Sequence, residues 1–596
     1  MDDSISRRDW LQFMSVASAG ALLPSTSLGS LPPQHQASPI LPLSSTSEVF
    51  TPPRGRALMK FSFDFPEPSI EFAGLRFSFI IFSRENAYSL DPGLMTVTRG
   101  DDGARLVVKG LRWAGGQEPA PGQLTAAFRR TPDGIEWQAT VTLDQPVKAV
   151  TAVVRGLPRG RLSAAGNPLF DPHDDEVLLG YPFGAGDLFG GNTADGLSTP
   201  LAVIEGTEGG FHFISSLDDR VRAKRLYFQP GPEGYRVEAV FEAEGWTDAS
   251  QLTVPTWRIG RTATLADAVE RHYRHLEQAY QLPQWQDRAD VPPWLRDTAL
   301  VLALHGMHYT GYIFNDFARM LEILAWVAEE IPARHVLVFL PAWDGRYYWD
   351  YPRYEPAPRL GGADGFARLI AEGKRLGFRF MPMFGANCAN RRQPGFERFA
   401  DAATSKIDGD RFDINWVDWD NDRHQEGWLS YMNRGVDSWR EWLTARIAGT
   451  IDRFGVDAYF LDIIGGWVDN PRADMHAGAR RMVGDLRSRY SHVLACGEFH
   501  YDALLEFIPL YQVHSPQVTP YARSFQHLSH PAPGRGSSGV HESGFNPIDP
   551  RGSATRTDGP IPTITVVDDT FSRQREAMKA VIRQARQWAG LPEEKR

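Results

Sequence analysis

Two carboxylic acids stand at the ends of apolar runs in the C-terminal half of the sequence. Asp462 follows the run 456–461, and Glu498 follows the run 493–497. Both runs have the length and composition of buried β-strands. A carboxylate at the end of such a strand loses hydration, which costs free energy, so its placement there needs a reason. Two neighbouring carboxyls push their pKa values apart, so that one stays ionised while the other holds a proton.

Such a pair is what the hydrolysis of a glycosidic bond needs. Cleavage with retention uses two carboxyls about 5–5.5 Å apart, and cleavage with inversion uses a gap of roughly 6.5–9.5 Å. Adjacent parallel strands can supply the shorter separation, which favours a retaining hydrolase that uses Asp462 and Glu498. An inverting hydrolase, a transglycosylase and a carbohydrate-binding protein without turnover remain alternatives.

Other polar or aromatic residues follow predicted strands and are candidates for substrate contact: His305, Asp344, Asn387, Trp467, His514, Asp568 and Asp569. For the two histidines, Asp344 and Asn387, a structural role is as good an interpretation as contact with substrate. A second group of aromatic side chains, which we interpret as a sugar-binding platform on loops, comprises Trp343, Tyr347, Tyr348, Trp349 and Tyr351. The segment 412–428 adds three tryptophans to the same expected cleft.

The elements that must position these residues alternate between strand and helix. Predicted strands cover 300–305, 335–340, 378–384, 456–464, 493–498, 508–514 and 561–567, and predicted helices cover 317–330, 365–376, 438–454, 477–489 and 573–588. Repeated strand–helix units with apolar strands indicate a parallel sheet covered by helices, and this many units favour a (β/α)8-type, TIM-like barrel over 293–596. Only seven strands can be identified, so either an eighth strand gives no clear signal in the sequence, or the barrel is open or completed in an unusual way. In such barrels the active site lies at the carboxyl ends of the strands.

The first half of the chain has a different pattern. Between residues 56 and 263, short runs such as 75–82, 135–141 and 235–241 alternate with glycine, proline and aspartate. Period-two alternation at this spacing predicts an all-β sandwich. A helical connector is expected over 264–292, so the chain is multidomain.

The N-terminus has the features of an export signal. Arg7 and Arg8 precede a short, weakly apolar run, which predicts a twin-arginine signal over 1–29 followed by a flexible linker over 30–55. The run is too short to span a membrane, which takes about 20 apolar residues. We therefore expect the chain to be a partner of the twin-arginine export machinery and to reach the periplasm or the extracellular space.

Composition excludes several other classes of function. A net charge of −10 argues against a nucleic-acid binder, and no polybasic segment suits an anionic membrane surface. Cys388 and Cys496 are interpreted as buried thiols rather than a disulfide, and no cysteine–histidine spacing indicates zinc. The alternating aspartates 418, 420 and 422 lack the glycine and glutamate of a calcium loop, so no metal is expected. No glycine-rich phosphate loop follows a strand, and no organic cofactor is expected either.

An aspartate that ends the fourth strand, a glutamate that ends the fifth and a β-sandwich ahead of the barrel resemble the endo-α-N-acetylgalactosaminidases and their uncharacterised relatives. The carboxylate arrangement is more distantly similar to that of the α-amylase superfamily, although Phe460 stands where that superfamily has an arginine. The resemblance implies that Asp462 is the nucleophile, that Glu498 is the acid/base, and that Asp568 or Asp569 is a third carboxylate. It also implies α-linked sugars as substrate.

Overall fold

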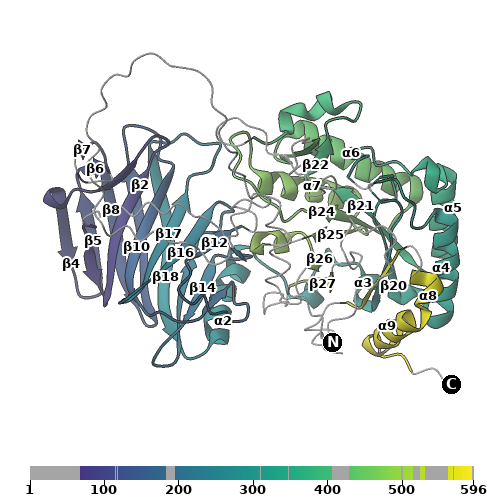
Figure 1. Ribbon diagram of the computed structural model, residues 1–596, viewed down its shortest axis with the longest axis horizontal. Helices are drawn as coiled ribbons and strands as arrows, with labels where there is room; N and C mark the ends of the chain where they lie inside the picture. Colours follow the sequence, from purple (N-terminus) through teal and green to yellow (C-terminus); the bar gives the residue numbers. More distant parts are fainter. Residues whose placement is uncertain are drawn as a thin grey trace, which may run out of the picture.

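The computed structural model describes two kinds of architecture in one chain (Figure 1). The described residues are 67–113, 116, 118–182, 195–308, 310–346, 348–405, 428–498, 501–513, 524–529, 561–567 and 570–592. The predicted signal and linker lie outside these residues, as do His514, Asp568, Asp569, Tyr347 and nearly all of the segment 412–428. Antiparallel sheets make up the N-terminal half, and a parallel sheet with covering helices makes up the C-terminal half.

The N-terminal half contains two large sheets. The first has the order β13(Asp195–Gly196), β12(Val177–Tyr181), β16(Lys224–Gly231), β17(Gly234–Glu242), β10(Ala149–Leu157), β2(Leu75–Phe82), β3(Ala87–Leu90), β6(Leu111–Trp113) and β7(Pro119–Ala120), with β1(Ile70–Phe72) beside β2. The second has the order β11(Leu162–Ala164), β14(Leu201–Glu205), β15(Phe211–Ser216), β18(Gln251–Thr262), β9(Gly134–Thr142), β8(Gln123–Thr131), β5(Gly103–Val108) and β4(Met95–Arg99). All neighbouring strands are antiparallel except β12 and β13, which are parallel.

An aromatic core joins the two sheets. Phe77 of β2 lies 5.0 Å from Phe128 of β8, and Phe79 lies 5.9 Å from Trp137 of β9, measured between ring centroids. Alternate residues of β17 are buried, which is the pattern of a strand with one face toward a core. The predicted β-rich N-terminal half is therefore confirmed.

The helix α2(Leu265–Ala279) follows the second sheet and packs against it. Thr264 caps the helix by accepting a hydrogen bond from the backbone N–H of Asp267 at 3.1 Å. Its apolar face contacts β14, β15 and β18. The predicted helix is thus present, and it belongs to the packing of the second sheet.

The parallel sheet has eight strands, one more than the sequence indicated. In spatial order they are β27(Gln526–Ser529), β26(Leu510–Val513), β25(Leu494–Glu498), β24(Ala458–Asp462), β21(Arg379–Gly385), β20(Val336–Leu340), β19(Leu300–Leu304) and β28(Thr563–Val566). A parallel bridge between Leu528 and Ile561 links β27 to the residue just before β28, so the two edges of the sheet meet. Of the two alternatives for the eighth strand, the structure supports a strand without a clear sequence signal, and the sheet is not one strand short. The strand that was overlooked, β27, holds one apolar residue in four and gives no periodic signal.

Helices accompany these strands along the chain. They are α3(Pro293–Asp297), α4(Phe317–Glu330), α5(Gly362–Leu376), α6(Asp437–Phe454), α7(Met475–Arg489), α8(Thr570–Arg573) and α9(Arg575–Trp588), with short 3-10 turns η2(Pro92–Leu94), η3(Trp285–Asp287), η4(Ala333–His335), η5(Pro358–Leu360), η6(Phe396–Ala402) and η7(Asp502–Glu506). A separate two-stranded antiparallel sheet pairs β22(Cys388–Asn390), just after β21, with β23(Leu429–Tyr431). The predicted helix 317–330 coincides with α4, whose cap Asp316 accepts from the N–H of Arg319. In the described part of the chain, none of the helices combines the length and the apolar character needed to cross a bilayer.

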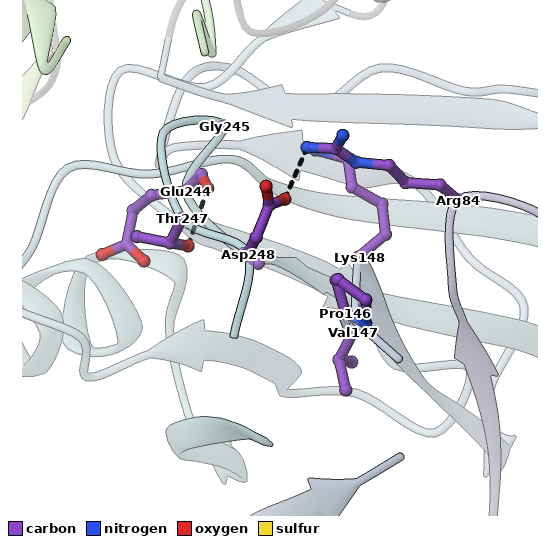
Figure 2. Close-up of a pocket in the computed structure, with 9 residues that line it drawn as sticks. Arg84, Pro146, Val147, Lys148, Glu244, Gly245, Thr247 and Asp248 are labelled. Atoms are coloured by element: carbon purple, nitrogen blue, oxygen red, sulfur yellow. Dashed lines mark hydrogen bonds and ion pairs between the residues drawn. The ribbon is translucent and has the colours of Figure 1, made fainter. Parts of the chain in front are cut away.

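The two halves meet through the loops that follow β24 and β25. Asp469, after β24, accepts from the N–H of Gly245 at 2.5 Å and pairs with Lys148 at 3.3 Å. Gly245 and Lys148 also line a small open pocket (Figure 2). That pocket lies among loops of the antiparallel half and is lined by none of the predicted site residues.

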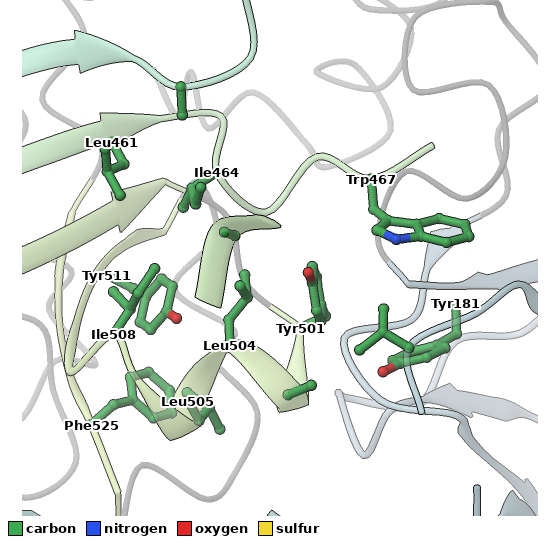
Figure 3. Close-up of a cluster of buried hydrophobic side chains, with 14 of the residues drawn as sticks. Tyr181, Leu461, Ile464, Trp467, Tyr501, Leu504, Leu505, Ile508, Tyr511 and Phe525 are labelled. Atoms are coloured by element: carbon green, nitrogen blue, oxygen red, sulfur yellow. The ribbon is translucent and has the colours of Figure 1, made fainter. Parts of the chain in front are cut away.

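Asp502, after β25, forms the second contact. Its carboxylate accepts from the hydroxyl of Tyr181 at 2.6 Å and from that of Thr199 at 2.7 Å. Figure 3 shows Tyr181 beside Tyr501 and Trp467 at this junction. Each strand that ends in a candidate catalytic carboxyl is therefore continued by a loop fastened to the antiparallel half.

Candidate active site

The structure brings Asp462 and Glu498 together at the carboxyl ends of β24 and β25. The two strands are parallel neighbours, with Leu461 paired to Gly497. Both carboxyls are buried, and their side chains are in hydrogen-bonding contact. They are therefore closer than the about 5–5.5 Å at which retaining glycosidases hold their carboxyls.

The two carboxyls have unequal surroundings. Glu498 accepts two N–H donors, the backbone amide of Ile463 at 3.0 Å and the side-chain amide of Gln512 at 3.1 Å. Donors of this kind favour the ionised form of a carboxyl. Burial, reinforced by the adjacent Glu498, raises the pKa of Asp462 well above its usual range. Without substrate these surroundings favour the protonated form of Asp462, whereas a nucleophile must be ionised.

The phenol of Tyr348 opposes that preference. It hydrogen-bonds the Asp462 side chain, and this contact acts to lower the pKa of Asp462. Tyr348 lies in the loop after β20 and adopts a left-handed backbone conformation with φ of 59°, which is rare for a bulky residue. Residues in such conformations persist where their surroundings fix them, and they concentrate at functional sites.

Three tyrosines of that loop form a chain of ring contacts. Tyr354 binds both the N–H and the carbonyl of Gly385, at 2.9 and 3.0 Å, and Gly385 is the register partner of Asp462. The ring of Tyr351 lies 5.3 Å from that of Tyr354 and 5.4 Å from that of Tyr348. Gly385 is required here because a Cβ atom would come within 2.4 Å of the Tyr351 ring. The end of β21 thereby anchors the chain of tyrosines that reaches Asp462.

Asp344 is a third buried carboxyl near the pair. Burial raises its pKa to about 7, with a smaller contribution from Asp350. The charges of both Asp344 and Asp462 act on the phenol of Tyr354, so both carboxyls lie near that side chain. Oδ2 of Asp344 has no hydrogen-bond partner among the described residues, so this carboxyl is suited to bind a polar group.

Asn387 has a structural role in the described contacts. Its side-chain amide donates to the carbonyl of Ile463 and to the hydroxyl of Tyr431 at 3.0 Å, and its oxygen accepts from Arg434. The residue is fully buried. Asn387 therefore holds the turn that follows Asp462.

Of the remaining predicted positions, the structure describes His305, Trp467 and most of the aromatic group after β20. His305 directly follows β19, where its carbonyl accepts from Asn315 at 2.9 Å and its ring lies 6.3 Å from that of Phe314. Trp467 has no exposed surface and lies at the junction of the two halves rather than on a cleft wall (Figure 3). The expected substrate platform after β20 is also largely interior, because Trp343, Tyr348 and Tyr351 are buried. His514, Asp568 and Asp569 are outside the described residues.

Both cysteines are free and buried, as the sequence indicated. Cys388 lies close enough to both carboxyls of the pair for their charges to raise its pKa, in addition to the larger effect of burial. In the described ranges, no group of three or more histidine, cysteine, aspartate or glutamate side chains is placed to hold a metal ion.

Sequence reasoning did not identify Tyr354, Gln512 or Arg434 as site residues. Gln512 of β26 occupies the register position opposite Glu498, and a polar residue near the end of an apolar strand was the available signal. Tyr354 and Arg434 lie in loops, where their contacts depend on how the chain folds and no periodic pattern marks them.

The fold is shared with known glycosidases. No family model matches the chain, and no curated protein matches it in sequence. The ligand-free α-N-acetylgalactosaminidase from Bifidobacterium bifidum is 14% identical and has a TM-score of 0.60, covering 87% of this chain and 93% of its own. A GH31 family sulfoquinovosidase from E. rectale is 11% identical with a TM-score of 0.51, over 89% of this chain and 82% of its own.

A third similar structure is a GH36 α-galactosidase from Geobacillus stearothermophilus, which is 10% identical with a TM-score of 0.50 and covers 86% of this chain and 75% of its own. At these identities the likeness establishes the fold: this chain has the architecture of multidomain glycosidases.

Proposed function

We propose that this chain is a retaining glycoside hydrolase acting on α-linked sugars, with its eight parallel strands forming the (β/α)8 barrel of such enzymes. The observation that carries the proposal is the contact between two buried carboxyls, Asp462 and Glu498, at the carboxyl ends of neighbouring parallel strands. The fold is one that α-N-acetylgalactosaminidases and an α-galactosidase share, which favours an α-galactoside or an α-N-acetylgalactosaminide as substrate.

The proposed reaction is a double displacement. Glu498 protonates the leaving oxygen while Asp462 attacks the anomeric carbon, and Glu498 then deprotonates the water that releases the sugar. The glycosidic oxygen enters between the two carboxyls, so substrate separates them to about 5–5.5 Å. Asp344, whose pKa is raised to about 7, binds a sugar hydroxyl in this scheme.

Azide trapping tests both activity and roles. The wild type, Asp462→Ala, Glu498→Ala and the exposed control Asp485→Asn are assayed on dinitrophenyl α- and β-glycosides of galactose, N-acetylgalactosamine and glucose. One displacement inverts the anomeric centre and two retain it. Azide should therefore give a β-glycosyl azide with Asp462→Ala and an α-glycosyl azide with Glu498→Ala, and wild-type product should be the α-anomer by NMR.

Other outcomes are equally clear. A β-anomeric product released by the wild type from an α-glycoside indicates inversion. The same azide anomer from both variants refutes the assignment of roles. A wild type no more active than its two alanine variants on every glycoside refutes hydrolysis and leaves a carbohydrate-binding protein.

We also propose export through the twin-arginine machinery. The support is Arg7–Arg8 ahead of a short apolar run. Replacing both arginines by lysine should retain the full-length chain in the cytoplasm, with fractionation and immunoblotting as the measurement. Unchanged export of that variant would refute this route.

A further inference from the structure

Arg434 is a buried arginine whose guanidinium contacts the turn after Asp462 as well as the phenols of Tyr431 and Tyr501. It is fully buried, and in the part of the chain that the structure describes no carboxylate lies within ion-pairing distance of it. Its guanidinium donates to the carbonyl of Ile464 at 2.7 Å, to that of Gly466 at 3.1 Å and to the side-chain oxygen of Asn387. A buried charge without a counter-ion is costly, so this position calls for a function.

The carbonyls that Arg434 binds belong to the turn directly after Asp462. Asn387, held by Arg434, donates to the carbonyl of Ile463. The carbonyls of Ile463, Ile464 and Gly466 therefore each accept from one of these two side chains. Ile463 itself has φ of 54°. A β-branched residue is a strong outlier in this left-handed region. The turn therefore needs external contacts to keep its shape.

That shape aims two backbone amides at the residue opposite. The N–H of Ile463 donates to Oε2 of Glu498, and the N–H of Gly465 donates to the Glu498 carbonyl, both at 3.0 Å. If Ile463 relaxed to an ordinary backbone conformation, its N–H would turn away from the carboxyl. The conformation of one residue thus connects the strand end of Asp462 to the environment of Glu498.

We propose that Arg434, acting through Asn387, is a positioning residue that holds Ile463 in its left-handed conformation and thereby fixes the backbone amide on Glu498. This inference rests on the proposed function, in which Glu498 is the acid/base. The guanidinium suits the task because its planar fork donates to several oxygens in fixed directions, which the point charge of a lysine does not reproduce.

Besides the backbone amide of Ile463, three titratable side chains face Glu498. They are Asp462 on β24, Cys388 on β22 and Cys496 on its own strand. Tyr348 and Tyr354 face Asp462. All remain in place in a variant of Arg434, so a change in the pH profile reports the amide contact.

The test compares Arg434→Lys with the matched control Arg440→Lys. Arg440 is also buried and also donates to a backbone carbonyl, that of Gly435, at 3.2 Å. For Arg434→Lys we expect kcat to fall at least tenfold with KM nearly unchanged. The alkaline limb of the kcat/KM profile should shift to higher pH by about one unit, because loss of an N–H donor makes Glu498 harder to ionise. The control should keep the wild-type limbs.

Glycine at position 463 supplies the second arm, because glycine adopts positive φ without strain. In the double variant Arg434→Lys/Ile463→Gly, the lysine substitution should cost much less activity and move the alkaline limb less than it does alone. Effects that simply add, or a loss of activity with both limbs unmoved, would overturn the proposal and leave Arg434 a purely structural residue.

A stability cycle keeps the test independent of turnover. The loss in melting temperature caused by Arg434→Lys should be smaller in the Ile463→Gly background than in the wild type, whether or not the protein hydrolyses any glycoside. An inert wild type together with such coupling would refute the proposed function and retain the positioning of the turn. A protein that hydrolyses glycosides but shows no such coupling would retain the proposed function and refute the positioning of the turn.

Discussion

The carboxyl of Asp502 predicts a pH dependence of stability that can be worked out from the structure. Burial raises its pKa to about 6, although hydroxyls of Tyr181 and Thr199 donate to it. In an unfolded chain the pKa is about 3.9. A raised folded-state pKa stabilises the fold below the unfolded value, and that contribution is lost as pH rises through about 6. The shift of about two units corresponds to about 3 kcal/mol in total, of which about 2 kcal/mol is lost between pH 4 and pH 7 because the unfolded carboxyl is already half ionised at pH 4.

Asp502→Asn isolates this contribution because an amide does not titrate. The asparagine oxygen can accept from Tyr181, and its N–H can donate to Thr199, whose hydroxyl then donates to His272. The pair Thr199–His272 already lies at 2.6 Å. Burial lowers the pKa of His272 to about 3, so this imidazole stays neutral throughout the range. Burial lowers the pKa of Lys224, and the Asp218 carboxylate, which pairs with it at 3.0 Å, acts in the opposite direction.

The assay is urea unfolding followed by tryptophan fluorescence at steps between pH 4 and pH 7. The stability of the wild type minus that of Asp502→Asn should fall by about 2 kcal/mol across this range, with most of the change between pH 4 and about 6. The exposed control Asp485→Asn should show a constant difference. A difference for Asp502→Asn that stays constant, or that grows with pH, would refute the reasoning.

Two further predictions concern single side chains. Tyr348→Phe removes a donor to Asp462, so the pKa of Asp462 rises further and the acidic limb of kcat/KM should move up by about one pH unit; an unmoved limb would mean that the phenol does not set the ionisation of Asp462. Trp467→Ala should lower the free energy of unfolding by about 3–5 kcal/mol because the side chain is fully buried, whereas Trp113→Ala, 51% exposed, should change it by less than about 0.5 kcal/mol. Similar costs for the two tryptophans, or a change in KM alone for Trp467→Ala, would restore Trp467 as a substrate contact.

The regular elements were largely predictable from the sequence because their signals are local. The helix α4 combines a capping aspartate with an apolar face at helical spacing, and both the cap and the face are visible in the sequence. Seven of the eight parallel strands are apolar runs bounded by polar residues. The eighth, β27, is four residues long and mostly polar, and its place in the sheet follows from pairing with distant strands. No local pattern specifies that pairing.

The candidate site was predictable at its centre and less so around it. The positions of Asp462 and Glu498 follow from strand order alone, since residues that end adjacent parallel strands lie side by side. For Trp467 the sequence cannot distinguish a buried ring from a sugar platform, because both uses select the same residue type. The position of Asn387 depends on Arg434, which lies in a different loop 47 residues later.

The features that the sequence missed share a physical cause. Four non-glycine residues on the loops after β20 and β24 have positive φ: Ala342, Tyr348, Tyr354 and Ile463. These conformations are unfavourable locally, and contacts from other parts of the chain maintain them. Of these four, Tyr348 hydrogen-bonds Asp462 through its phenol, and Ile463 donates its backbone N–H to Glu498.

The loops after β24 and β25 are fastened in turn to the antiparallel half through Asp469 and Asp502. The carboxyl pair is thus set by contacts from both halves, which gives the antiparallel sheets a direct part in the geometry of the proposed reaction.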